Sequence, residues 1–207
     1  MLTMSTLKKS ASEFHHGNLR ASLIAAGVWQ VDRHGLNSLS LRQLSLATGV
    51  SQTAAYRHFE DLEHLKAEVS KAAREALAVL MLERLKNIKS LNPKEAAVQR
   101  LWDSGAAYIE FAIRHPNLFE IAFITYHAPK LEPENPSPWG VLNECLDKLL
   151  EEELISRELR TEAPVISWSM VHGFAGLAAQ GFTGTNKETA AATKVVLNSV
   201  LRSLGVK

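Results

Sequence analysis

The chain has 207 residues, of which 46% are hydrophobic, and a formal net charge of +1. This length and apolar content are enough for a substantial core, which excludes a disordered protein. The single cysteine, Cys145, excludes an intrachain disulfide and a thiolate-rich metal site. No apolar run approaches the roughly 20 residues that span a bilayer, so we expect a cytoplasmic protein with no membrane partner.

Charge is distributed unevenly along the chain. Residues 1–60 contain six Lys and Arg against three Asp and Glu, a net charge of +3. The remaining 147 residues contain 17 basic and 19 acidic side chains, a net charge of −2. A basic amino-terminal unit on an acidic body is consistent with one phosphate-facing end.

Strand patterns are nearly absent and helical periodicity recurs, which predicts an all-α fold of about nine helices. Apolar residues at steps of three and four between Leu19 and Val31 predict a helix ending near Gly35. Asp61 should cap a long helix to about Ser90. Further helices are expected over 93–115, with Asn92 as its cap, and over 117–126, 139–153, 162–181 and 187–204. A proline-rich loop is expected at 128–138.

Residues 40–62 have the pattern of a helix-turn-helix. Ser40 and Gln43 have the spacing of a reciprocal capping box at the start of a first helix. Gly49 can end that helix in the left-handed conformation, and Ser51 can cap a second helix to about Phe59. The alternative is an ordinary helical hairpin, because such caps are common.

The outward side chains of this segment suit a DNA groove. Gln and Thr can address base edges, whereas Tyr and Arg commonly hold phosphates. The candidate DNA contacts are Arg42, Gln52, Thr53, Tyr56 and His58.

The body is rich in aromatic residues that can line an apolar small-molecule pocket, although such residues are also typical of a plain core. The candidate pocket residues are Trp102, Tyr108, Phe111, Phe123, Trp139, Trp168 and His172.

Small residues give the penultimate helix a smooth face, and the last helix has an apolar stripe. The candidate dimer residues are Gly173, Gly176, Leu197, Val200, Leu201 and Leu204, unless the stripe is buried within one subunit.

Several segments together resemble the TetR (tetracycline-repressor-like) family of transcriptional regulators, over essentially the whole chain. They are residues 15–20 (His-His-Gly-Asn-Leu-Arg), 49–51, 56–59, 108–112, His115-Pro116, and Trp168-x-x-x-His172-Gly173. The last three resemble one subgroup, which has a Trp-x-x-x-His-Gly sequence in its C-terminal domain.

This resemblance implies a three-helix DNA-binding head at 1–60 and an effector-binding and dimerisation domain at 61–207. It also implies a homodimeric repressor that binds a double-stranded DNA operator and is released by a small apolar or amphipathic effector, with no cofactor and no metal. Leu62 stands where the family usually has a lysine, so one phosphate contact is expected to be missing. That loss would reduce the salt slope of DNA binding by about one unit.

Two other classes of protein remain as alternatives. An enzyme would have to assemble its site from His115, Glu120, His127, Glu144 and His172, none of which has a recognised ligand or catalytic spacing. We therefore do not expect an enzyme. A helical adaptor that binds protein through the head is the second alternative.

Overall fold

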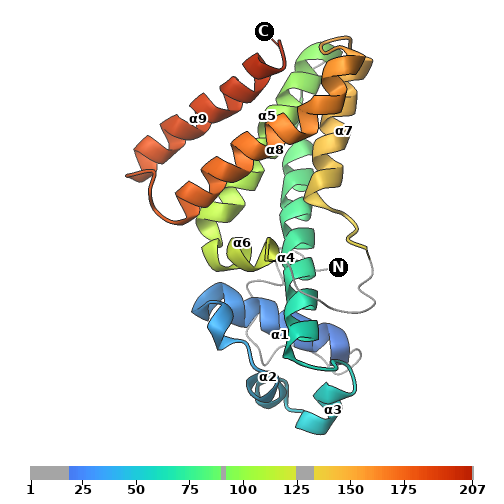
Figure 1. Cartoon of the computed structure of the whole chain (residues 1–207), viewed down its shortest axis with the longest axis vertical. Coiled ribbons are helices and arrows are strands. Elements are labelled where there is room, and N and C mark those ends of the chain that lie inside the picture. Colours follow the sequence, from blue (N-terminus) through green and yellow to red (C-terminus); the bar gives the residue numbers. More distant parts are fainter. Residues whose placement is uncertain (1–18, 90–91, 125–132, 207) are drawn as a thin grey trace. The chain divides into compact units, whose positions relative to one another are not determined.

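The computed structural model describes residues 19–89, 92–124 and 133–206. Within these ranges all regular secondary structure is helical, which confirms the all-α prediction (Figure 1). A short 3-10 helix, Leu36–Ser38, follows the first α-helix. The α-helices are α1 (Leu19–His34), α2 (Leu41–Thr48), α3 (Gln52–Tyr56), α4 (Leu62–Leu85), α5 (Pro93–Arg114), α6 (Pro116–Ala122), α7 (Pro138–Glu151), α8 (Arg157–Ala179) and α9 (Asn186–Ser203).

The contacts divide the chain into two compact units. The first unit comprises residues up to 76 together with 115–135, and the second comprises 77–114 together with 136–207. Helix α4 contributes its first part to one unit and its last part to the other. The expected functional division at residue 60 stays a prediction. None of the described helices is long and apolar enough to cross a membrane.

Helix α1 organises the first unit, because α2, α3 and α6 all contact it. Its buried side is made by Leu23, Val28 and Val31, each fully buried. Gly27 lies where α1 meets α4: a Cβ atom there would be 2.8 Å from Val69 Cγ2. This glycine is therefore required by close packing rather than by a turn.

Polar contacts join α1 to its neighbours in this unit. Arg20 forms an ion pair with Glu68 of α4. His115 Nδ1, just before α6, lies 2.9 Å from the Asp32 carboxylate. Asn117 Nδ2 of α6 donates to the Asp32 carbonyl at 3.0 Å. These contacts fix both α4 and α6 against α1.

Helix α5 organises the second unit, where α7, α8 and α9 pack against it. Figure 1 shows α8 and α9 running side by side as an antiparallel pair. Helix α9 begins with a capping box in which Thr185 and Glu188 bond reciprocally. Large fully buried side chains fill the core of this unit, among them Ile109, Phe111, Leu146 and Leu149.

Several predicted helix starts are confirmed by the hydrogen bonds of the caps. Ser51 Oγ accepts from Ala54 N at 3.2 Å, and Asp61 Oδ1 accepts from His64 N at 2.8 Å. Asn92 Oδ1 accepts from Lys94 N at 3.0 Å at the start of α5. Gly49 has φ 71° and ψ 28°, the expected left-handed end of α2. In each case the signal is local, so the sequence pattern is sufficient.

The predicted capping box at Ser40 was wrong. Ser40 is the residue before α2, but its side chain makes no capping hydrogen bond. The Gln43 side chain does not reach back, since its Oε1 accepts a hydrogen bond from Gln30 Nε2 of α1 at 2.7 Å. A tertiary contact therefore replaces the local one.

Four predicted helix boundaries also need correction. Helix α3 ends at Tyr56, because His58 N bonds to Ala55 O and tightens the turn before Phe59. Helix α4 ends at Leu85 and α6 at Ala122, each followed by a turn. Helix α8 starts at Arg157, five residues early, because Ser156 Oγ accepts from Leu159 N, and Pro164 lies inside the helix.

We predict that Gly27→Ala destabilises the protein by about 1 kcal/mol. The overpacking cost is about 1–3 kcal/mol, and it exceeds the gain in helix propensity of about 1 kcal/mol. Val69 cannot easily rotate away, because it is β-branched and fully buried. Urea unfolding measures the change in free energy. In combination with Val69→Ala, the glycine substitution should cost less than it does alone, and purely additive effects would contradict the packing argument.

Candidate functional site

The turn between α2 and α3 is fixed by hydrogen bonds within the segment. Val50 N donates to Ser45 O at 2.9 Å, across the left-handed Gly49. The Ser45 hydroxyl is buried and donates to Leu41 O at 2.8 Å, so it leaves no unpaired polar group between the helices. Ser45 therefore fits between the two helices because it is small and its hydroxyl has a backbone partner.

Buried side chains behind this turn hold α3 in place. Leu44, Ala55 and Phe59 are at most 1% exposed. The Arg20 guanidinium carbon lies 5.7 Å from the centre of the Phe59 ring. The His64 ring meets Phe59 edge to face at 5.6 Å. Phe59 is thus enclosed by α1 and α4 although it lies outside any helix.

The opposite face of α2 and α3 is open. Each of the five candidate DNA contacts is exposed, and Tyr56 is 56% exposed. The neighbouring Leu46 on α2, which the sequence did not single out, is 73% exposed. These side chains have the accessibility that groove contact requires, while the contact itself stays a prediction. The five residues are Arg42, Gln52, Thr53, Tyr56 and His58.

Leu62 is the first residue of α4 and is half-buried. Its side chain has no donor and offers nothing to a phosphate. Lys66, one turn later, forms an ion pair with Glu63 at 2.7 Å. Leu62 therefore cannot supply a phosphate contact at this helix start, as expected from the sequence.

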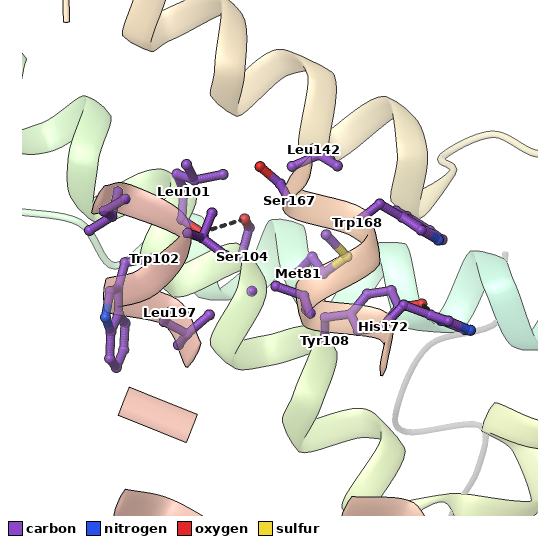
Figure 2. A pocket seen from close by; sticks show the side chains of 14 residues that line it. Met81, Leu101, Trp102, Ser104, Tyr108, Leu142, Ser167, Trp168, His172 and Leu197 are labelled. Atoms are coloured by element: carbon purple, nitrogen blue, oxygen red, sulfur yellow. Dashed lines mark hydrogen bonds between the residues drawn. The ribbon is translucent and has the colours of Figure 1, made fainter. Parts of the chain in front are cut away.

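A hollow lies inside the second unit, between α5, α7, α8 and α9 (Figure 2). It has about 440 Å³ of empty space when its open mouth is counted. Little of this space is wide enough for a water molecule, so a larger occupant requires lining side chains to move. The lining is almost entirely apolar.

Four of the seven candidate pocket residues line this hollow: Trp102, Tyr108, Trp168 and His172. Phe111 is fully buried in the core, and Phe123 belongs to the other unit. Trp139 is 45% exposed and meets Trp168 edge to face at 5.4 Å. The effector role of these residues stays a prediction. His127, one of the residues considered for an enzyme site, lies outside the described residues.

Tyr108 and His172 form a hydrogen-bonded pair at the hollow. Tyr108 Oη lies 2.7 Å from His172 Nδ1, and the His172 ring stacks on Trp168 at 6.0 Å. Burial raises the pKa of Tyr108 and lowers the pKa of His172 from its ordinary value of 6.5. Both side chains are therefore uncharged at neutral pH.

Sequence reasoning missed two serines of the lining, Ser104 and Ser167. Ser104 Oγ donates to Leu101 O at 2.9 Å. Ser167 Oγ is buried and has no hydrogen-bond partner among the described residues. The available signal was spacing, since Ser104 lies one turn before Tyr108 and Ser167 lies one turn before Val171.

The candidate dimer residues fall into two groups. Leu197, Val200 and Leu204 are at most 3% exposed within the single chain, which corresponds to the alternative of burial in one subunit. Leu201 is partly exposed. Gly173 and Gly176 have open space where a Cβ atom would lie. The large apolar side chains that are exposed here are instead Val165, Leu177, Phe182 and Val195.

Among the described residues, no group of three or more His, Cys, Asp or Glu could hold a metal ion. The arrangement is thus a helix-turn-helix in one unit and an apolar hollow in a helical second unit. This combination is typical of helical transcription regulators that have a separate regulatory domain.

Comparison with known proteins relates the second half of the chain to one family of domains. Residues 101–200 match the tetracyclin repressor-like C-terminal domain. An uncharacterised HTH-type transcriptional regulator of Bacillus subtilis (strain 168), YobS, is 25% identical over 174 residues, covering 79% of this chain and 81% of that protein.

Solved structures share the fold. A protein of unknown function from Rhodococcus sp. RHA1 superposes with a TM-score of 0.70 at 24% identity, over 90% of this chain and 97% of that one. A TetR variant from Acinetobacter baumannii AYE, solved with minocycline, has a TM-score of 0.61 at 18% identity, over 88% and 94% of the chains. The protein has the fold of a TetR-family transcription regulator and a tetracycline-repressor-like C-terminal domain. Such proteins are regulators and not enzymes.

We predict that His172 makes the protein less stable in mild acid. Its pKa is lower in the folded chain than in the unfolded chain, so the unfolded state binds the proton first as the pH falls below about 6.5. Stability is therefore fully present above this pH and declines until the folded pKa is reached. Urea unfolding at about pH 7.5 and about pH 5.5 should give a smaller loss for His172→Asn than for the wild type.

The matched control is His58→Asn, since His58 is exposed in the other unit. This variant should retain the wild-type dependence on pH. An equal loss in wild type and His172→Asn would contradict the role given to burial.

Proposed function

We propose that the protein is a dimeric, sequence-specific DNA-binding repressor that a small apolar or amphipathic effector releases from its operator. Residues 1–60 would read DNA, and residues 61–207 would bind the effector and form the dimer, in the cytoplasm where the chromosome is accessible. The observation that carries the proposal is the open face of α2 and α3, supported by a buried back and a fixed turn.

The placement of side chains on α3 supports DNA recognition. Gln52 and Thr53 occupy the first turn of this helix, the part that typically contacts base edges in a helix-turn-helix. Tyr56 and Arg42 are exposed beside them and suit phosphate contacts. A single head of this size buries little DNA surface, so specific binding favours two heads on adjacent half-sites.

A stripe along α8 supports dimerisation. Val165, Ser169, Gly173 and Leu177 follow one another at four-residue steps and all are exposed. Such a stripe is apolar or small throughout, and its glycine permits a close approach of a second helix. The exposed Val195 lies on α9, the helix that packs beside α8. We infer that these two helices from each subunit form the dimer interface.

The hollow of the second unit supports effector binding. Its lining is aromatic and aliphatic with few polar groups, which is the usual composition of a small-molecule site. The Acinetobacter relative described above was solved with minocycline. An effector acts only through a difference in affinity between two conformations, and couplings of about 1–3 kcal/mol change operator affinity by about 5- to 150-fold.

We predict that Gln52→Ala weakens operator binding by about 5- to 150-fold, because the loss of a base contact costs about 1–3 kcal/mol. Gel-shift titration with DNA that flanks the native gene measures this change against nonspecific competitor DNA. Gln99→Ala is the matched control, since Gln99 is exposed on α5 in the other unit. Binding of wild type that shows no sequence preference at low salt would overturn the repressor proposal and favour a protein-binding adaptor.

Arg42 tests the phosphate contacts separately. Arg42→Gln should weaken binding to all DNA sequences similarly and reduce the salt slope by about one unit. A change in sequence preference instead would contradict the phosphate role assigned to this side chain.

We predict that Leu177→Glu converts the dimer to monomers, because it places a charge in the proposed apolar interface. Sedimentation velocity gives the oligomeric state. Leu46→Glu provides the matched control, since Leu46 is 73% exposed on α2 in the other unit. A Leu177→Glu protein that remains dimeric would place the interface elsewhere.

A further inference from the structure

The polar side chains that line the hollow differ in whether their hydroxyl groups have a hydrogen-bond partner. Tyr108 is hydrogen-bonded to His172, and Ser104 donates to Leu101 O. Ser167 is 1% exposed, and its hydroxyl has no partner within the described parts of the chain. Figure 2 shows this hydroxyl on the side of α8 that faces Leu101 and Ser104 of α5. The hollow therefore contains a buried hydroxyl available to an occupant.

A buried hydroxyl without a partner is unfavourable, because it has lost its hydrogen bonds to water. A ligand with a matching donor or acceptor would restore one of these bonds. An entirely apolar ligand would leave the hydroxyl unsatisfied. Ser167 therefore favours ligands that carry one hydrogen-bonding group at this end of the hollow.

The rest of the lining sets the charge of the ligand. None of the described residues that line the hollow is Asp, Glu, Lys or Arg. Burial keeps the pKa of Tyr108 high and the pKa of His172 low, so neither supplies a charge at neutral pH. An ionised ligand would lose its hydration without gaining a counter-ion, which is costly.

The aromatic rings of the lining favour a particular shape of ligand. Trp168 meets Tyr108 edge to face at 5.3 Å and stacks on His172 at an interplanar angle of 12°. In Figure 2, Trp102 and Trp168 lie on opposite sides of Ser104. Trp102 Nε1 donates to Asn198 Oδ1 at 3.2 Å. Ring faces and edges of this kind favour planar ligands through offset or edge-on contacts.

We propose that the effector is a small, planar, uncharged molecule, mostly apolar, whose one neutral hydrogen-bonding group pairs with the Ser167 hydroxyl. This inference rests on the proposed effector site and specifies its ligand class. Little of the hollow is wide enough for a ligand. The ligand therefore enters as Met81, Leu142 and other flexible side chains of the lining shift.

Three single-ring probes separate the contributions of charge and hydrogen bonding. Phenol is uncharged with one hydroxyl, toluene is uncharged without one, and benzoate is ionised at neutral pH. Calorimetry or ligand-observed NMR with the full-length protein gives each dissociation constant. We expect phenol to bind at least about 100-fold more tightly than benzoate, because the lining offers no cation.

The Ser167→Ala variant tests the hydrogen bond. It should weaken phenol binding about 2- to 10-fold and leave toluene binding unchanged, as expected for the loss of one neutral hydrogen bond. Ser169→Ala is the matched control, since Ser169 is exposed on the same helix and is not among the lining residues. It should bind both probes as wild type does.

The stability of the unliganded variant provides a second readout. Ser167→Ala should unfold at the same or a higher urea concentration than wild type, because no internal hydrogen bond is lost. A destabilised variant with unchanged phenol affinity would overturn the proposal, since Ser167 would then be a structural residue. Tighter binding of benzoate than of phenol would also overturn it.

Operator binding without probe is measured in parallel. If operator binding is specific but no probe binds in the expected order, the ligand class is wrong and the repressor function stands. If the probes bind in that order but operator DNA is not recognised, the repressor function is wrong and the pocket chemistry stands.

Discussion

Helix α3 has only five residues, and this shortness is the constraint on which the proposed DNA-reading face depends. A helix of this length is not stable in isolation, because nucleation costs more than its few hydrogen bonds return. Its position must come from neighbours: the Ser51 cap, the burial of Ala55, and Phe59 held beneath Arg20. The surface proposed to read DNA is therefore only as rigid as the packing of α1, α2 and the start of α4.

Helix α4 contributes residues both to that packing and to the second unit. Val69 touches Gly27 of α1 near its beginning, and about three turns later Met81 lines the hollow. Arg74 and Ser70 donate to the carbonyl of Ala122, at the end of α6. One uninterrupted helix thus carries both head contacts and pocket contacts. A ligand that displaces Met81 acts on an element that also bears on α1.

Local chemistry explains which features could be predicted from the sequence. The caps at Ser51, Asp61 and Asn92 and the left-handed Gly49 involve residues within one turn, so their pattern was sufficient. Tertiary contacts explain the failures: Gln43 is taken by Gln30, and Ser167 acquires its importance only from the helices around it. Aromatic content predicted four lining residues, but it could not separate these from Phe111, which is plain core.

Helix α8 links the two roles proposed for the second unit, because its opposite faces have different surroundings. Ser167, Val171 and His172 line the hollow, whereas Val165 and Leu177 are exposed on the stripe. Pro164 lies inside this helix and removes a backbone donor near its first turns, a position at which helices commonly bend. A ligand wedged against the inner face would therefore shift or bend the helix that carries the proposed dimer stripe. Effector binding and the proposed dimer contact would then be coupled through one helix.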